Sequence, residues 1–338
     1  MILDRLKAQL TGRSAGPETP TVAQGPAGAA GTAPGTGRVS VVIPLYNHAR
    51  YIGEAVRSVL SQGPVLRELI VVDDGSRDDS AAVMAGLART DPRIVFWSHP
   101  NRGAHATLNA GIHRATGDYV AILNSDDSFE PGRLDRLVAL LEGDAGADLA
   151  ASSISFMNGE GAAIENAWHA EALAELERSG DMAAALINGN FLMTTSNFVF
   201  RRSLVEEVGG FAPLRYAHDL DFALRLLARG RRIVLSPEKL LRYRMHDSNT
   251  ISESHDRVRL EWAAVTAFFL HAIWDRPDAP PVDWACARAL TEVTDRHLLT
   301  RPVLLLMAWF RRHPSDSLEH SAFAQDRALV DALGPDVR

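Results

Sequence analysis

The sequence lacks the features that mark secreted and membrane-spanning proteins. It contains a single cysteine, Cys286, which cannot form an internal disulfide, so nothing requires an oxidising compartment. No apolar run approaches the roughly 20 residues that span a bilayer. The segment Met1–Leu10 is short, mixed and charged, and it lacks the long apolar core of a signal peptide. We therefore expect a cytoplasmic protein.

An excess of basic side chains is also missing. The 338 residues carry 35 Lys and Arg against 42 Asp and Glu, which gives a formal net charge of −7. Binding to a nucleic-acid backbone needs a basic face, so we do not expect nucleic acid to be the main partner. With 46% hydrophobic and 23% charged residues, the composition is typical of a globular protein. The length allows one large α/β domain or two modest ones.

Large apolar residues are scarce between Gly12 and Gly37, where Gly, Pro, Ala and Thr dominate. Such a segment cannot bury enough surface to offset the entropy lost on ordering it. We predict a flexible leader over residues 1–37, a main α/β domain over 38–252 and a helical extension over 253–338.

Strand patterns alternate with helical spacings in the first half of the main domain. This alternation predicts a largely parallel sheet with helices on both faces, in which ligands gather beyond the carboxyl ends of the strands. The predicted strands are Val39–Ile43, Leu69–Val72, Ile94–Trp97 and Tyr119–Leu123, and the predicted helices are Tyr51–Leu60, Ser80–Arg89 and Leu108–Arg114.

The second half of the main domain is less regular. Residues 158–190 have the pattern of an insertion with helical pieces. Around it we expect strands at Ala147–Phe156, Ser196–Phe200, Ile233–Leu235 and Leu240–Tyr243, and helices at Arg202–Val208 and Leu220–Leu227.

Two adjacent carboxylates, Asp126 and Asp127, follow the fourth predicted strand. They repel each other unless a cation or hydrogen-bond donors offset their charge, and Mg²⁺ and Mn²⁺ take such oxygen ligands. A polar turn that caps a helix beginning near Pro131 explains them equally well.

Three further polar residues allow two interpretations each. Asp74 at a strand end could accept hydrogen bonds from a base or ribose, or belong to a turn that precedes a helix cap at Asp79 or Ser80. Asp219 could be a general base or cap the helix that it begins. His246 could bind a metal or phosphate, or be an ordinary loop histidine.

The order in which these clusters occur resembles the large inverting family of GT-A glycosyltransferases, over about Val39 to Ile251. Each motif is weak alone, but the ordered set is specific. The motifs are Val39 to Asn47, Val72-Asp73-Asp74-Gly75-Ser76, Asn101-Arg102-Gly103, Asn109-Ala110-Gly111, Gly117-Asp118-Tyr119, Asn124-Ser125-Asp126-Asp127, Gly209-Gly210-Phe211, His218-Asp219-Leu220-Asp221 and Tyr243-Arg244-Met245-His246.

The resemblance implies a role for each candidate site residue. Asp126 would bind a divalent ion, Mn²⁺ or Mg²⁺, and His246 would contact the metal or the diphosphate. Asp219 would be the catalytic base. The remaining roles are in donor binding: Pro44, Tyr46 and Asp74 would cradle the base of a nucleotide-diphosphate sugar, and Asn124 and Asp127 would lie near its ribose and diphosphate.

The sequence departs from the family pattern at two positions. Asn124 replaces the usual first Asp of an Asp-x-Asp metal motif, which removes one negative charge. His218 replaces the usual Glu before the base, and a charged histidine would lower the pKa of Asp219 rather than raise it.

The implied reaction is a metal-assisted single displacement that inverts the anomeric centre. It moves a sugar, which we expect to be UDP-linked, to a hydroxyl group of a saccharide or lipid-linked acceptor. Polysaccharide assembly is the process that the family suggests. The alternative is a non-catalytic sugar-nucleotide-binding protein that acts through its helical tail, which Asn124 favours. A nucleotidyltransferase fits less well, because Pro44-Leu45-Tyr46-Asn47 stands where a Gly-rich phosphate loop belongs.

The sequence of the helical extension allows several partners for its helices. Arg301–Arg312 could lie on a membrane face, which would make the protein a peripheral one at the inner membrane. A buried core helix or a homodimer helix is the simpler interpretation.

Overall fold

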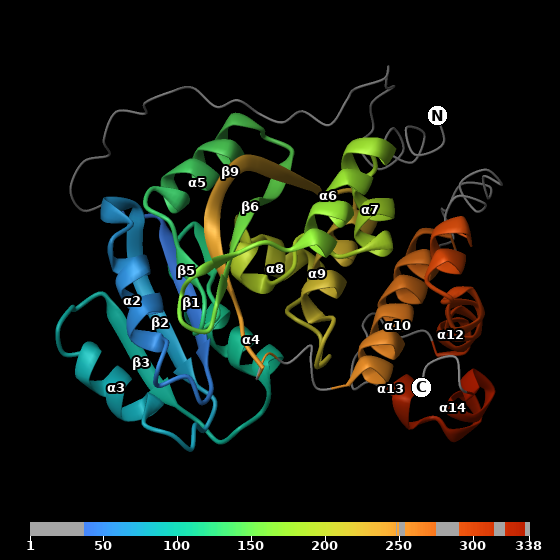
Figure 1. Cartoon of the computed structure of the whole chain (residues 1–338), viewed down its shortest axis with the longest axis horizontal. Coiled ribbons are helices and arrows are strands. Elements are labelled where there is room, and N and C mark those ends of the chain that lie inside the picture. Colours follow the sequence, from blue (N-terminus) through green and yellow to red (C-terminus); the bar gives the residue numbers. More distant parts are fainter. Residues whose placement is uncertain (1–36, 248, 250–253, 275–290, 314–321, 335–338) are drawn as a thin grey trace.

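A computed structural model describes residues 37–247, 249, 254–274, 291–313 and 322–334 (Figure 1). The predicted leader therefore lies almost entirely outside the described residues. The strands β1 (Val39–Leu45), β2 (Leu66–Asp73), β3 (Ile94–Ser98) and β4 (Tyr119–Ile122) form a parallel group in the order β3-β2-β1-β4. All four were predicted, with bounds that differ by at most three residues.

The sheet continues beyond β4 with the order β8-β6-β9-β5, and β7 pairs with β6. β6 and β9 are parallel to each other, whereas β8 runs antiparallel to β4 and β6, and β5 runs antiparallel to β9. The added strands are β5 (Ser128–Phe129), β6 (Ala147–Asn158), β7 (Ala163–Ile164), β8 (Val199–Arg201) and β9 (Arg232–Met245).

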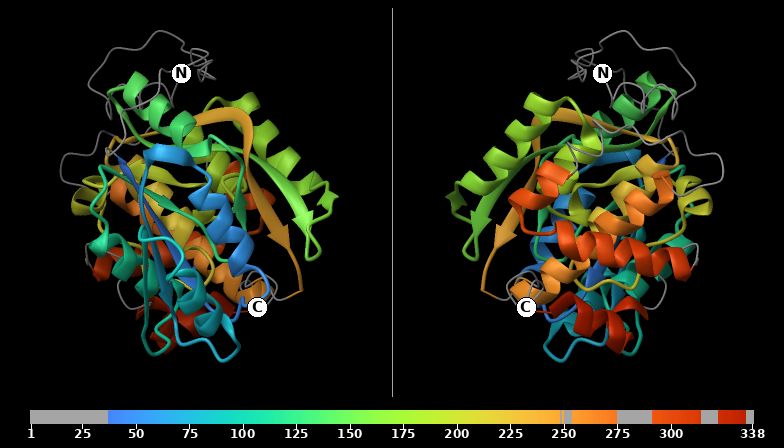
Figure 2. Two further views of the ribbon diagram at one scale, coloured as in Figure 1. Left: turned by 90° about the vertical axis from the view of Figure 1, so that its left-hand side faces the viewer. Right: turned by 90° about the vertical axis from the view of Figure 1, so that its right-hand side faces the viewer.

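Three predicted strands are wrong in detail. The segment predicted as the strand Ser196–Phe200 begins instead with the 3₁₀ turn η2 (Thr195–Asn197), and the strand follows it as β8. The two short strands expected at 233–235 and 240–243 are one curved strand, β9 (Figure 2). Its pairing with β6 shifts register between Ser236 and Lys239, so a bulge accommodates the intervening proline without ending the strand.

Helices cover both faces of the sheet, as predicted. Alternate residues of β1 belong to different cores: Val41 packs with α2 (Ile52–Leu60) and α5 (Arg133–Gly143), whereas Val42 packs with α4 (Ala104–Arg114) and α9 (His218–Ala228). Smaller helical elements complete the domain, namely η1 (Gly63–Val65), α3 (Ser80–Leu87), α6 (Ala167–Ser179), α7 (Met182–Asn188) and α8 (Leu204–Val208).

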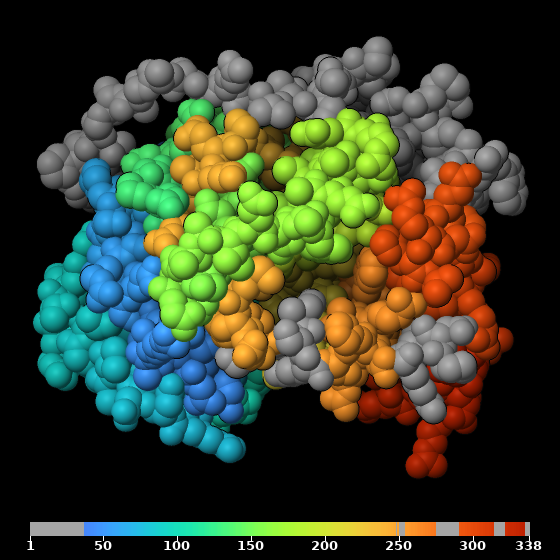
Figure 3. Space-filling model, in the orientation of Figure 1, coloured from blue at the N-terminus to red at the C-terminus, as the bar shows by residue number. Residues whose placement is uncertain are grey.

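The insertion at residues 158–190 contains the predicted helical pieces, α6 and α7, after the short strand β7. In the space-filling view this part of the chain crosses the front of the molecule, between the N-terminal strands and helices and the C-terminal helices (Figure 3). It therefore lies beside both parts of the fold.

The helices after residue 253 share the core of the main domain. The helix α10 (His255–Trp274) buries Ala264 and Phe268 in the same cluster as Phe222 of α9. α12 (Thr300–Arg312) places Phe310 against Phe268, with ring centroids 5.3 Å apart, as a core helix does. Two short helices follow, α13 (Ala322–Gln325) and α14 (Arg327–Leu333). Among the described residues, we find no helix with both the length and the apolar character needed to cross a bilayer.

Two of the sequence motifs meet to place α9. The Asn109 side chain of α4 donates to the carbonyl of Phe211 over 2.9 Å and accepts from its amide over 2.8 Å. A Cβ atom at Gly210 would come within 2.5 Å of the Asn109 Oδ1 atom, so a side chain there would displace the Asn109 amide from Phe211. The Phe211 ring then stacks on Phe222 of α9, with centroids 4.6 Å apart.

Candidate functional site

The residues expected to hold a nucleotide base lie at the carboxyl ends of β1 and β2. Pro44 pairs in register with Val72 of β2, and Tyr46, just after β1, leaves 41% of its surface exposed. The amide of buried Asp74, just after β2, donates to the carbonyl of Leu45 over 2.8 Å. The two strand ends therefore bring all three predicted residues to one edge of the sheet.

The Asp74 carboxylate holds the loop that leads into α4. Its two oxygens accept from the amides of Arg102, over 2.7 Å, and Gly103, over 2.9 Å. Each carboxylate oxygen has two lone pairs, so both can accept a further donor. The tight turn expected at Gly75 is present, with φ of 71°. Asp74 thus fixes this loop, and its carboxylate oxygens can still accept another hydrogen bond.

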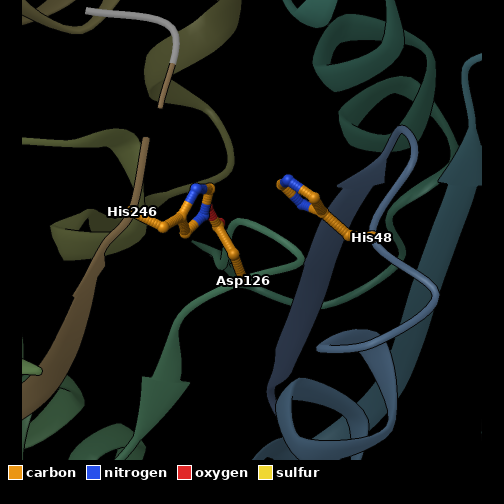
Figure 4. Close-up of side chains that lie close together, drawn as sticks. All are labelled: His48, Asp126 and His246. Atoms are coloured by element: carbon orange, nitrogen blue, oxygen red, sulfur yellow. The ribbon is translucent and has the colours of Figure 1, made fainter. Parts of the chain in front are cut away.

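Three potential metal ligands meet at the neighbouring strand ends. His246 Nε2 lies 3.1 Å from Asp126 Oδ2, and ligand atoms of His48, Asp126 and His246 all lie within 4.8 Å of one another. Figure 4 shows the Asp126 and His246 side chains meeting and His48 facing them from the loop after β1. The His48 Nδ1 atom lies 2.8 Å from Ser125 Oγ, a contact that leaves Nε2 for a ligand. The sequence interpretation had missed His48.

The two adjacent aspartates have opposite pKa shifts. Burial would raise the pKa of Asp126, but the hydrogen bond with His246 and the charge of His48 hold it below its ordinary value. Burial and the neighbouring Asp126 charge raise the pKa of Asp127 well above its ordinary value. Of the two carboxyl groups, Asp126 is therefore the one that favours the ionised form, which is the form that can bind a metal ion.

Asp127 and Asn124 contact one stretch of chain, residues 190–196, which we call the bridging segment. The Ser196 hydroxyl donates to Asp127 Oδ2 over 2.6 Å. The Asn124 amide donates to Thr194 Oγ1 over 2.9 Å, and its oxygen accepts from Thr195 Oγ1 over 3.1 Å. Both polar atoms of Asn124 are therefore engaged by the bridging segment.

The helix-capping explanation of Asp126 and Asp127 does not hold. α5 begins at Arg133, and its N-cap residue is Gly132, with no side-chain cap. The second oxygen of Asp127 accepts instead from the amide of Arg244, over 2.9 Å.

Asp219 lies in the first turn of α9 and is buried. It is not the capping residue, because the N-cap of α9 is Ala217. The Asn190 amide, at the start of the bridging segment, donates to Asp219 Oδ2 over 2.9 Å. Burial raises the pKa of Asp219 to about 6, against the opposing effect of its hydrogen bonds. A carboxyl group in this state suits proton transfer near neutral pH.

The expectation that His218 would lower the pKa of Asp219 is wrong. Burial lowers the pKa of His218, so its imidazole is held neutral and supplies no positive charge to the next residue. The desolvation of Asp219 therefore decides the direction of its pKa shift.

The side chain of Tyr243 connects the two halves of the site. Burial raises its pKa, and the charges of Asp127, Asp126 and Asp219 raise it further. The Tyr243 hydroxyl therefore lies within electrostatic range of all three carboxylates. The bridging segment gives an independent limit, since six residue steps cover at most about 20 Å. Asp126 and Asp219, predicted to share one site, thus both act on the buried Tyr243 side chain.

Buried Arg244 holds the metal-ligand cluster in place, although the sequence interpretation gave it no role of its own. Its Nε atom donates to the Asp126 carbonyl over 2.8 Å, and its guanidinium bonds to Glu54 over 2.6 Å. The guanidinium also lies over the Tyr51 ring, 4.8 Å from its centroid, and that ring stacks on His246. An arginine in a strand gives no sequence signal for such a role, because its contacts come from distant residues.

The architecture and the site have close parallels among known proteins. The family model for glycosyl transferase family 2 matches residues 40–209, half of the chain. The chain belongs to this family.

Individual relatives and structures agree with this assignment. An uncharacterized glycosyltransferase of Nostoc is 30% identical over 217 residues, 63% of this chain and 66% of that protein. The succinoglycan biosynthesis protein ExoO of Rhizobium meliloti is 33% identical over 208 residues, 59% of this chain and 58% of that protein. The chain thus spans about two thirds or less of these relatives.

Solved structures show the fold. S. aureus TarS 1–349 in complex with UDP-GlcNAc superposes with a TM-score of 0.60 at 18% identity, over 88% of this chain and 80% of that one. The mannosyltransferase PcManGT of Pyrobaculum calidifontis, in complex with GDP-Man and Mn²⁺, gives 0.55 at 20% identity, over 88% and 81%. The predicted GT-A fold is therefore confirmed.

Proposed function

We propose that the chain transfers a glycosyl group from a nucleotide-diphosphate sugar to a hydroxyl group of an acceptor, with inversion at the anomeric carbon. The observation that carries this proposal is the pairing of two unlike groups around Tyr243. One is the cluster of Asp126 with two histidines, and the other is the isolated carboxyl of Asp219, whose pKa of about 6 suits a base. Membership of glycosyl transferase family 2 supports it.

The donor half of the proposed site is the edge formed by β1 and β2. Pro44 and Tyr46 would pack against the nucleotide base, and Asp74 would accept a hydrogen bond from its ring nitrogen. Asn124 and Asp127 would line the ribose and diphosphate region. UDP-linked sugars are the donor class that we propose to test first, since the TarS structure holds one.

The residues present fit a divalent cation. Asp126 and His246 would bind it, and His48 adds a third ligand atom at a suitable separation. Asn124 is an unsuitable ligand because Thr194 and Thr195 engage its amide. An oxygen and two imidazole nitrogens form a donor set that suits Mn²⁺ better than Mg²⁺. When bound, such an ion offsets the charge that develops on a diphosphate leaving group.

Asp219 would supply the base. Its carboxylate would take the proton of the acceptor hydroxyl as the oxygen attacks the anomeric carbon from the face opposite the diphosphate. The bond to the diphosphate breaks in the same step, so one displacement inverts the centre and needs no protein nucleophile. Asn190 would keep the carboxylate oriented through its bond to Oδ2.

We propose a saccharide or lipid-linked saccharide as the acceptor, within polysaccharide assembly. The support is that ExoO, a relative, is named for succinoglycan biosynthesis.

A two-part experiment tests the proposed function. Thermal unfolding is followed with UDP, GDP and their sugars, with Mn²⁺ or with chelator, because a ligand that binds the folded form alone raises the melting temperature. Nucleotide release is then measured with the stabilising donor and a panel of saccharides. A metal-dependent rise in melting temperature together with acceptor-dependent release supports the proposal. Binding without release over a broad panel would leave a binding protein instead.

A further inference from the structure

The helix α10 lies beyond the residues matched by the family model, yet two neighbouring side chains of this helix reach the surroundings of Asp219. Glu261 and Trp262 stand side by side on α10 and contact different segments of the main domain. One segment runs into α9, which carries Asp219. The other runs from α7 to the bridging segment, whose first residue, Asn190, binds the same carboxylate.

Glu261 holds the chain immediately before α9. Its carboxylate accepts from three successive amides, those of Arg215 over 2.9 Å, Tyr216 over 2.6 Å and Ala217 over 3.0 Å. Ala217 is the N-cap residue of α9 and has no side chain that could cap the helix. An anion at a helix N-terminus satisfies unpaired amides and interacts favourably with the helix dipole. Glu261 therefore fixes the segment that leads into α9 and places a negative charge near the positive end of its dipole.

Trp262 holds the segment that leads from α7 to Asn190. Its Nε1 atom donates to the carbonyl of Ile187 over 3.1 Å, in the last turn of α7. Two residues of the C-terminal region support the same turn, because Arg296 and His297 approach the Asn188 side-chain oxygen at 2.9 Å and 3.2 Å. Asn190 follows two residues later, so this turn sets where the Asn190 amide meets Asp219.

We propose that Glu261 and Trp262 are positioning residues for Asp219, and that α10 is thereby part of the catalytic unit. The inference rests on the proposed function, because it takes Asp219 to be the base. A base must stay within about 0.5 Å of its productive position, and an error of about 1 Å can cost about a hundredfold in rate. Glu261 holds the segment that leads into Asp219, and Trp262 holds the turn that leads to Asn190, so the two contacts together supply that precision.

The test compares Glu261→Gln with a matched control, Glu68→Gln. Glu68 also accepts three hydrogen bonds, from Ser40 and from the amide and hydroxyl of Thr116, but it lies near the start of β2, away from the carboxyl ends of the strands. We expect Glu261→Gln to lower kcat about 10- to 100-fold with the donor KM within about twofold. Glu68→Gln should leave both within about twofold.

The pH profile distinguishes positioning from general weakening of the fold. Asp219 interacts electrostatically with Asp221 on its own helix and with Tyr243 on β9, and Glu261 interacts with the neighbouring His218, whose pKa burial lowers. Loosening the segment before α9 admits water, so the acidic limb of the kcat profile should move from about pH 6 toward the ordinary aspartate value of about 4. In an Asp219→Asn background, Glu261→Gln should cause no further loss of kcat, since residues that act as a unit are not additive.

A second pair of variants tests Trp262. Trp262→Phe removes the indole donor and keeps an aromatic ring, and Trp309→Phe is its control, because Trp309 Nε1 donates to Asp326 near the C-terminus over 2.9 Å. Only Trp262→Phe should lower kcat and increase amide exchange in residues 187–192.

The outcomes separate the inference from the proposed function. If the wild-type protein transfers sugar but Glu261→Gln matches Glu68→Gln in kcat and acidic limb, the inference fails and the proposed function stands. If the wild-type protein transfers nothing, the proposed function fails. The catalytic part of the inference then fails with it, and amide exchange tests only its structural part, which is upheld if Glu261→Gln increases exchange at residues 217–222 and Glu68→Gln does not and is refuted otherwise.

Discussion

Replacing Asp219 by asparagine removes the proposed base while keeping the size and shape of its side chain. The remaining oxygen can still accept from the Leu220 amide, and the Asn190 side chain can turn its Oδ1 atom toward the new NH₂ group, so the fold around the site should persist. Metal and nucleotide binding should also persist, because the donor half of the site lies at other strand ends. Transfer is the property that should fall, since a positioned general base contributes about 100- to 10,000-fold to a rate.

The pKa of Asp219 also predicts how kcat of the wild-type protein depends on pH. With a pKa of about 6, the Asp219 carboxyl is about nine-tenths ionised at pH 7 and about one-tenth ionised at pH 5. Only the ionised form accepts a proton, so kcat should fall about tenfold between these values. The residual rate of Asp219→Asn should be flat over the same interval.

The free energy of unfolding should fall as the pH rises, whereas kcat should increase. The folded-state pKa of about 6 exceeds the unfolded value of about 3.9, so the stability linked to this carboxyl is complete below pH 4. It is lost as the pH rises through 6, by about 3 kcal/mol at most. The asparagine variant has no charge to bury, so it should be about 1–3 kcal/mol more stable than the wild type at pH 8, with no such gain at pH 4.

Steady-state kinetics and urea unfolding at both pH values measure these effects. Asp148→Asn is the control, because burial also raises the pKa of Asp148, near the start of β6. It should leave the kinetic profile unchanged. Transfer by Asp219→Asn at near wild-type rates, or an acidic limb that survives the substitution, would refute the assignment of the base.

Further predictions concern the metal ligands and one structural contact. Asp126→Ala should weaken nucleotide binding in Mn²⁺ or Mg²⁺ but not in chelator, measured by calorimetry, and an equal loss in both would remove the metal role. His48→Gln should weaken Mn²⁺ binding about 10- to 100-fold in electron paramagnetic resonance titrations, as expected for a lost ligand or its support; unchanged affinity would limit the ligands to Asp126 and His246. Asn109→Ala should lower the free energy of unfolding by about 1–3 kcal/mol, because it leaves the buried amide and carbonyl of Phe211 without that partner.

The sequence predicted the parallel half of the sheet well because its strands are continuous apolar runs. Val39–Leu45 and Leu66–Asp73 are buried along nearly their whole length, and this burial is visible as composition. Prediction failed where local composition and tertiary pairing disagree. Pro237 within Ser236–Lys239 suggests a break, but the strand pairing with β6 continues across a bulge. The polar residues Thr195–Asn197 form a turn, in which the Thr195 and Ser196 hydroxyl groups donate to Asn124 and Asp127.

The candidate site was predicted in its separate parts. Order along the chain pointed to Asp126, His246 and Asp219, but the contacts that support them come from residues far away in sequence. His48 carries no signal of its own after Asn47, and the Arg244 side chain reaches Glu54 only in the folded state. Glu261 lies in a helix whose pattern indicates burial alone. Such residues become visible only when distances in space replace distances along the chain.

The bridging segment has a consequence for how the two substrates influence each other. It contacts Asp127 at one end and Asp219 at the other, with only six residue steps between them. If the chain binds a donor and an acceptor as proposed, we expect a donor that shifts Ser196 to shift Asn190 as well, and an acceptor that shifts Asn190 to act back on Ser196. Linkage makes this influence reciprocal, so any change in acceptor affinity caused by the donor is matched by an equal change in donor affinity caused by the acceptor.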